Sequence, residues 1–197
     1  MAAKKLKTKI RREQIAQAAL DIVSTGGLKQ LSVAEVALRI GLVPSALYRH
    51  VKKKDDILTL IDERIESKLL ANVAAVCEQT DDPLERLHQL FLRHIRLISE
   101  NRGIPVVIFS QDFHADNLER KTRICKMISS YLKEVAALLK QAQAGGHIAK
   151  SVDIDAAAML FLGLIQPPMI LWHLSEGDFD VQRHAKSAWP LFLKAIK

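Results

Sequence analysis

Four polar or aromatic side chains, Ser45, Tyr48, Arg49 and His50, lie close together in the first quarter of the chain. Side chains of these types contact base edges and phosphates in nucleic-acid complexes. By contrast, the sequence contains no GxSxG, P-loop or HExxH motif, and no GxGxxG after a strand pattern. We therefore predict a nucleic-acid-binding protein that is not an enzyme, with no catalytic residue, no metal site and no cofactor.

The positive charge of the chain is concentrated in the same region. Residues 1–54 contain 12 Lys and Arg against three acidic side chains, a net charge of +9, whereas the whole chain of 197 residues carries +7. Basic side chains that neutralise phosphates release counterions, which favours binding. We predict a DNA-binding head at residues 1–54 with a basic arm at residues 1–8, although a solvated tail explains residues 1–9 equally well.

Apolar periodicity predicts the first two helices of this head. Between Thr8 and Ser24, apolar residues recur at three- and four-residue spacing, as one buried helical stripe requires, and two glycines end the helix. The stripe consists of Ile15, Ala18, Ala19, Ile22 and Val23. Ser32, followed three residues later by Glu35, is a capping-box pattern that begins a second helix, which Gly41 closes.

Pro44 is suited to the first position of a third helix, predicted over residues 44–50. Leu47 and Val51 share its inward side, and the polar residues face outward. This helix is about 10 Å long, which suits a DNA major groove about 12 Å wide. The two short helices with a Gly-containing turn predict a helix-turn-helix, although an ordinary helical hairpin explains the apolar stripes as well.

The amino-acid sequence of this region resembles that of the DNA-binding domain of the TetR family over about 50 residues. The matching fragments are Ile15-Ala-Gln-Ala-Ala-Leu20, Gly26-Gly27-Leu28, Leu31-Ser-Val-Ala-Glu-Val-Ala37, Gly41, Ala46-Leu-Tyr-Arg-His50 and Lys54-Asp-Asp-Ile-Leu58. The chain departs from the family pattern at Val43, where many relatives have Ser or Thr. Without this side-chain cap, the third helix is expected to gain part of its stability from DNA.

The resemblance implies a role for each matching residue of the head. The backbone amides of Ser32 and Val33, at the start of a helix, contact a phosphate. The DNA groove is contacted by Pro44, Ser45, Tyr48 and Arg49. The DNA backbone is contacted by His50 and Lys54. For Tyr48, packing between helices is an alternative.

Beyond the head, apolar patterns predict six further helices, and therefore an all-α fold of about nine helices. Their ranges are 54–77, 83–100, 104–112, 117–144, 153–175 and 180–196. By resemblance, residues 55–197 form a ligand-binding and dimerisation domain. Such a domain encloses a small-molecule pocket, and its last two helices form a four-helix bundle in a homodimer.

Several side chains on apolar stripes are candidates for contact with a small-molecule effector. They are His88, Phe91, His94, Phe109, Phe113 and Gln166. Ordinary core packing is the alternative for the histidines and phenylalanines. Gln166 precedes Pro167 and Pro168, which are expected to kink the helix and free carbonyls for a ligand, unless they only shape the dimer interface. Candidates for the dimer interface are Phe161, Ile165, Trp172, Trp189 and Phe192.

No membrane span is expected, because the longest apolar stretch, from Ala156 to Leu174, is interrupted by two prolines. The N-terminus lacks the apolar run of a secretory signal, so a cytoplasmic location is expected. Cys77 and Cys125 lie inside apolar helical patterns and are predicted to be buried, reduced thiols.

Taken together, these features predict a homodimeric repressor that binds a palindromic operator in double-stranded DNA and is released by a small, largely apolar effector. The alternative is a DNA-binding regulator of the same fold without a small-molecule ligand, which is constitutive or controlled by a protein partner.

Overall fold

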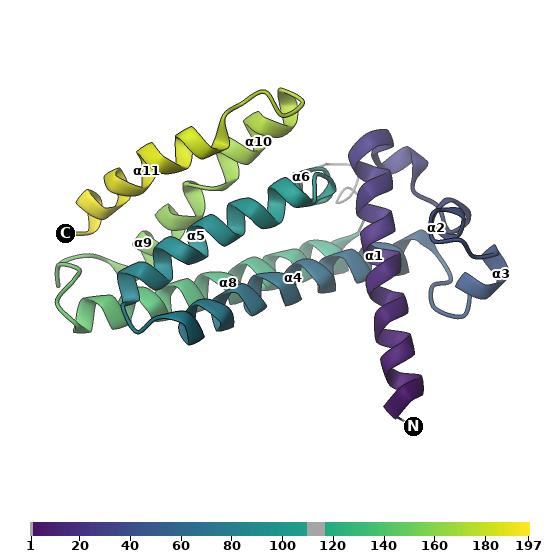
Figure 1. Cartoon of the computed structure of the whole chain (residues 1–197), viewed down its shortest axis with the longest axis horizontal. Helices are drawn as coiled ribbons and strands as arrows, with labels where there is room; N and C mark the ends of the chain where they lie inside the picture. Colours follow the sequence, from purple (N-terminus) through teal and green to yellow (C-terminus); the bar gives the residue numbers. More distant parts are fainter. Residues whose placement is uncertain (1, 110–116) are drawn as a thin grey trace. The chain divides into compact units, whose positions relative to one another are not determined.

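The computed structural model describes residues 2–109 and 117–197, with side chains from residue 8 onward, and its regular structure there is entirely helical. The helices are α1 Ala2–Gln30, α2 Val33–Arg39, α3 Pro44–Leu47, α4 Lys54–Gln79, α5 Pro83–Glu100, α6 Gly103–Phe109, α8 Leu118–Ala144, α9 Ile154–Gly163, α10 Gln166–Leu174 and α11 Val181–Ile196 (Figure 1). The predicted all-α fold is confirmed.

The chain divides into two compact units. The first unit comprises Met1–Ser67 with Asn101–Ile124, and the second comprises Lys68–Glu100 with Cys125–Lys197. The first unit therefore holds more than the predicted head, because α6 and parts of α4 and α8 belong to it. The boundary at residue 54 stays a prediction of where the DNA-binding fold ends.

Helix α1 buries the predicted apolar stripe, in which Ile15 and Ala19 are 0% exposed. The helix bends at Gly27, whose φ of 65° lies in the left-handed region that glycine adopts without strain. The predicted stop at the two glycines is therefore a kink, after which helical structure continues to Gln30.

Helix α6 approaches the backbone of α1 closely at Gly103. A Cβ atom on Gly103 would lie 2.3 Å from the carbonyl oxygen of Leu20. This distance is far inside van der Waals contact, so a residue without a side chain is required where the two helices meet.

A buried ion pair joins α4 to α8 inside the first unit. Asp62 Oδ1 accepts a hydrogen bond from Arg120 Nη2 at 3.2 Å, and the two side chains are 2% and 3% exposed. Arg123 adds a longer contact of 3.9 Å to Asp62 and donates a hydrogen bond to Thr59. Buried charges must be paired, so this contact constrains how α4 and α8 align.

The predicted helix over residues 153–175 is in fact two helices, α9 and α10. Pro168 has no backbone N–H and cannot bond to the carbonyl of Leu164, four residues earlier. Instead, Nε2 of His184 donates a hydrogen bond to that carbonyl at 3.2 Å. The prolines lie in the first turn of α10, where amides have no helical partner, rather than kinking a continuous helix.

Aromatic rings form the core of the second unit. The ring of Phe91 on α5 stacks on Trp189 at 5.8 Å and meets Phe161 edge-on at 6.2 Å. Phe192 packs against both Phe161 and Trp189 at 5.9 and 5.5 Å. These contacts hold α5, α9 and α11 together.

The segment Ile154–Leu174 has a mean hydropathy of 1.7 and is long and apolar enough to cross a membrane by length and composition alone. The structure interrupts it between α9 and α10, and 44% of its most apolar 18-residue stretch is buried. Core helices of folded proteins meet the same criterion.

The prediction of buried cysteines is wrong. Cys77 and Cys125 are free thiols with exposed side chains. Each lies among apolar residues in the sequence, yet on the outer side of its helix, because the buried stripe of each helix does not include it.

Replacing Gly103 with Ala is expected to lower the free energy of unfolding by about 1–3 kcal/mol, because the new methyl group forces α6 away from α1. Urea unfolding monitored by circular dichroism measures the change. Gly163→Ala is the control, since a Cβ there meets nothing within 4 Å. Equal stability of the two variants would contradict the close approach.

Candidate functional site

The start of α2 has the capping geometry that the sequence predicts. Ser32 is extended, with φ −144° and ψ 160°, and its hydroxyl accepts a hydrogen bond from the amide of Glu35 at 3.1 Å. Ser32 is exposed, whereas the side chain of Val33 is 8% exposed. Val33 can therefore offer only its backbone to a ligand.

Helix α3 is shorter than predicted. It covers Pro44–Leu47, and Tyr48 is its C-cap, so the predicted extent over residues 44–50 is wrong. No side chain caps its N-terminus at Val43, as expected from the sequence. The chain continues as a turn in which the amide of His50 bonds to the carbonyl of Leu47 at 2.8 Å.

The two faces of this segment follow the predicted pattern. Leu47 and Val51 are 0% and 1% exposed, whereas the side chains predicted to meet DNA lie at the surface. The exposed residues are Pro44, Ser45, Tyr48, Arg49 and His50. The ring of Tyr48 is 51% exposed, which argues against the alternative role in packing.

Lys54 has an internal contact that the sequence does not reveal. Its ammonium group donates a hydrogen bond to the carbonyl of Leu28, next to the kink in α1. An ammonium has three N–H donors, so one bond to the protein leaves donors for a phosphate. Lys54 therefore fixes the end of α1, in addition to the predicted role on DNA.

Asp56 organises the turn between α3 and α4. Its carboxylate accepts hydrogen bonds from the amides of Lys52 at 2.7 Å and Lys53 at 3.2 Å. The bond from Lys52 is the main cause that lowers the pKa of Asp56 below its usual value. Sequence reasoning missed this residue, although a carboxylate in a first helical turn is a known capping signal.

Some basic side chains in the segment 1–54 form ion pairs within the protein, and others are exposed. Arg12 pairs with Glu63 on α4, which ties α1 to α4. Lys53 lies 3.5 Å from Asp55. Other basic side chains are exposed and available to a polyanion, namely Lys9, Lys29, Arg39, Arg49 and Lys52.

Three of the predicted effector residues come together on α5. Phe91 is 0% exposed, and His88 stacks on Trp189 at 4.9 Å. His94 is 6% exposed, and its Nδ1 lies 3.1 Å from the hydroxyl of Tyr131. Burial lowers the pKa of His94 to about 4, so this imidazole is neutral near pH 7.

The other predicted effector residues are not part of this cluster. Phe109 belongs to the first unit and is 45% exposed, and Gln166 is half-buried at the start of α10. Phe113 lies outside the described residues.

Most residues predicted for a dimer interface are instead core residues of the second unit. Phe161 and Ile165 are 0% exposed, and Trp189 and Phe192 are 8% and 2% exposed, because they pack within the chain. Trp172 is half-buried. The exposed apolar side chains on the same helices are Met159, Leu160, Leu171, Leu174 and Leu191. The signal that sequence reasoning missed is that α9 and α10 are apolar on more than one face.

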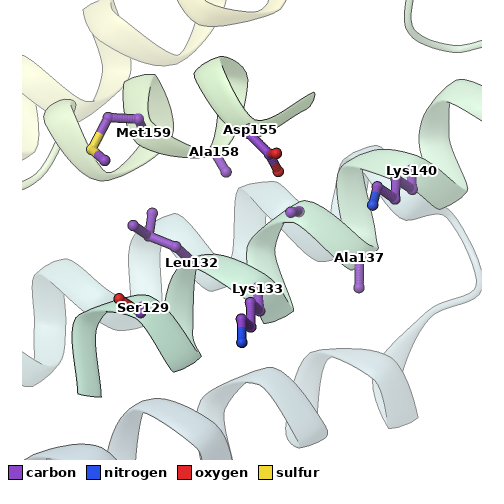
Figure 2. A pocket seen from close by; sticks show the side chains of 9 residues that line it. Ser129, Leu132, Lys133, Ala137, Lys140, Asp155, Ala158 and Met159 are labelled. Carbon is purple, nitrogen blue, oxygen red and sulfur yellow. The ribbon is translucent and has the colours of Figure 1, made fainter. Parts of the chain in front are cut away.

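A groove of about 390 Å³ lies between α8 and α9 in the second unit (Figure 2). None of the predicted effector residues lines it. Leu132 points from α8 toward α9, and Asp155 points from α9 toward α8.

Comparison with known proteins identifies the family. A family model described as YsiA-like protein, C-terminal region, of the TetR type, matches residues 61–195. The chain therefore belongs to the TetR family of transcriptional regulators, which are DNA-binding proteins and not enzymes. The family that the N-terminal region resembles is therefore confirmed for the chain, by a match to its C-terminal region.

Two curated relatives and one solved structure show the range of this similarity. The fatty acid metabolism regulator protein of Bacillus subtilis is 21% identical over 183 residues, which cover 93% of this chain and 94% of the relative. The nucleoid occlusion factor SlmA of Serratia proteamaculans is 25% identical over an alignment of 201 residues, which covers 100% of this chain and 100% of the relative. The crystal structure of Bacillus subtilis FadR in complex with stearoyl-CoA has a TM-score of 0.78 at 21% identity, covering 94% of this chain and 99% of FadR, and so shows the shared fold.

Replacing Lys54 with Met removes the ammonium group but keeps the aliphatic stem. The free energy of unfolding is expected to fall by about 1–2 kcal/mol, because the Leu28 carbonyl loses a charged donor. Lys52→Met is the control, since Lys52 is exposed and its substitution is expected to change stability by less than about 0.5 kcal/mol. A stability of the Lys54 variant equal to that of the control would mean that the internal bond contributes nothing.

The buried His94 predicts a loss of stability in mild acid. Its pKa is lowered to about 4 in the folded state, so the unfolded state takes up the proton first as the pH falls below about 6.5. The stability present at pH 7 is expected to decrease by about 2 kcal/mol by pH 5 from this group alone. His94→Gln, which can still bond to Tyr131, should show a flatter urea-unfolding profile over that range, and an unchanged profile would refute the assignment.

Proposed function

We propose that the protein is a ligand-responsive repressor that acts as a homodimer on a palindromic operator in the cytoplasm. The observation that carries this proposal is the α3 segment, whose buried side fixes it in the first unit and whose polar side lies exposed. In the proposed complex, the major groove is contacted by Pro44, Ser45, Tyr48 and Arg49. The phosphates are contacted by the side chains of His50 and Lys54 and by the backbone amides of Ser32 and Val33 at the start of α2.

Exposed apolar surface on α9, α10 and α11 supports dimerisation. Leu160, Leu171, Leu174 and Leu191 are between 46% and 73% exposed, and exposed apolar side chains of this kind are common at protein interfaces. In the proposed dimer, two α3 segments contact half-sites about one helical turn, roughly 34–36 Å, apart.

The effector proposed for this chain is a small molecule with a large apolar part. Two observations support it: a relative of the same fold is described in complex with stearoyl-CoA, and the α5 face of the second unit offers aromatic rings beside one polar pair. Phe91 and His88 would contact the apolar part, and the His94–Tyr131 pair would supply a hydrogen bond. Phe109, Phe113 and Gln166 stay weaker candidates.

The alternative is a regulator of the same fold that has no small-molecule ligand. The tight packing of Phe91 and His94 against neighbouring rings favours it, because an effector would have to displace these contacts. A full-length relative is named as a nucleoid occlusion factor, so the family includes proteins whose named role is not metabolic regulation.

The decisive experiment measures binding of the full-length protein to DNA from its own upstream region, over a range of salt concentrations. Specific, salt-dependent binding of a dimer is expected, and Arg49→Ala should reduce the preference for operator over random DNA about tenfold or more if Arg49 bonds to a base. Arg183→Ala on α11 serves as the control with the same loss of charge. No salt-sensitive affinity for any DNA would overturn the proposal.

The same assay separates the two candidate functions. If an effector such as a long-chain acyl thioester releases the operator, operator DNA must weaken effector binding by the same factor. Equal effector affinity with and without operator, or no release by a broad set of apolar compounds, favours the ligand-free regulator.

A further inference from the structure

The groove between α8 and α9 has a floor made of small apolar residues. Ala136 and Ala158 are 7% and 2% exposed, Leu132 is half-buried on the α8 wall, and Met159 is exposed on the α9 wall (Figure 2). Small residues allow another backbone to approach closely, because the distance between packed helices is set by the side chains at the contact. The groove therefore has a shape in which a segment of polypeptide chain can pack.

A row of lysines runs along the α8 side of this groove. Lys126, Lys133 and Lys140 are spaced seven residues apart, which places them on one side of α8 over about 21 Å. Among the residues that the structure describes, no salt bridge involves any of these three side chains. Lys133 and Lys140 line the groove itself, and Asp155 is its one acidic lining residue. The α8 side of the groove is therefore positively charged.

The charge and shape argue against two other occupants. A second copy seated by the same groove would bring lysines toward lysines, and the exposed basic side chains Arg183, Lys186 and Lys194 of α11 supply no opposite charge. A membrane surface is flat and does not fill a groove. An acidic chain segment with apolar side chains matches both the floor and the lysine row.

We infer that this groove docks an acidic amphipathic helix of a partner protein. Its apolar side chains, spaced three and four residues apart, lie on Ala136 and Ala158 between Leu132 and Met159, and its carboxylates pair with Lys133 and Lys140. This is the helix-in-groove mode of peptide recognition. The inference is independent of the effector and of the operator.

The test uses the full-length protein and a pair of synthetic amphipathic peptides of about 18 residues, identical except that Glu in one replaces Lys in the other. Fluorescence anisotropy measures their binding. The acidic peptide is expected to bind at least about tenfold more tightly than the basic peptide, and rising salt should reduce the difference.

Reversing the groove charges tests the site. The double variant K133E/K140E is expected to bind the acidic peptide about tenfold more weakly than the unaltered protein and to prefer the basic peptide. The matched control is K150E/K186E, which changes the net charge equally at exposed lysines of the same unit that do not line the groove. This control should keep the preference for the acidic peptide.

Filling the groove provides an independent measurement. Ala137 lines the groove and is exposed, so Ala137→Trp should block the peptide while the midpoint of thermal unfolding stays close to that of the unaltered protein. The inference is overturned if the acidic peptide does not bind, if both charge variants behave alike, or if the tryptophan variant folds and still binds normally.

Discussion

The conformation of the α3 segment depends on the burial of Leu47 and Val51. A helix of four residues without a side-chain cap at Val43 cannot hold its own conformation, because helix nucleation costs more than so few backbone bonds return. Burying two apolar side chains, at roughly 1.5–3 kcal/mol each, supplies what the local bonds lack. Because Leu47 and Val51 fix the buried side of this segment, the side chains of Tyr48 and Arg49 face solvent.

Polar contacts between distant parts of the sequence complete the first unit. Lys54 binds the carbonyl of Leu28, Asp56 holds the turn that precedes α4, and Asp62 meets Arg120 where α4 passes α8. Each of these side chains lies on α4 or α8, and both helices also supply residues to the second unit. The contacts named here all lie within the first unit.

The second unit combines a filled aromatic core with three distinct features at or near its surface. The exposed leucines of α9 to α11 are the proposed contact with a second copy, the α5 face with the His94–Tyr131 pair is the proposed effector site, and the lysine-lined groove is the proposed seat of an acidic helix. The packing of Phe91 on Trp189 means that an effector at the α5 face must open existing contacts.

The sequence by itself determined the features that depend on neighbouring residues. Apolar periodicity located most helices, and Ser32 and Pro44 marked helix starts. The positive charge of residues 1–54 indicated a polyanionic binding partner, and the resemblance to the TetR family predicted the fold. Only the tertiary structure decided which apolar face is covered. It buried Trp189 and Phe192 inside one chain and exposed both cysteines, because periodicity shows that a side chain lies on a stripe but not what packs against that stripe. It also ended α3 at Leu47 and gave Lys54 an internal partner 26 residues away, since such contacts form only when distant segments meet.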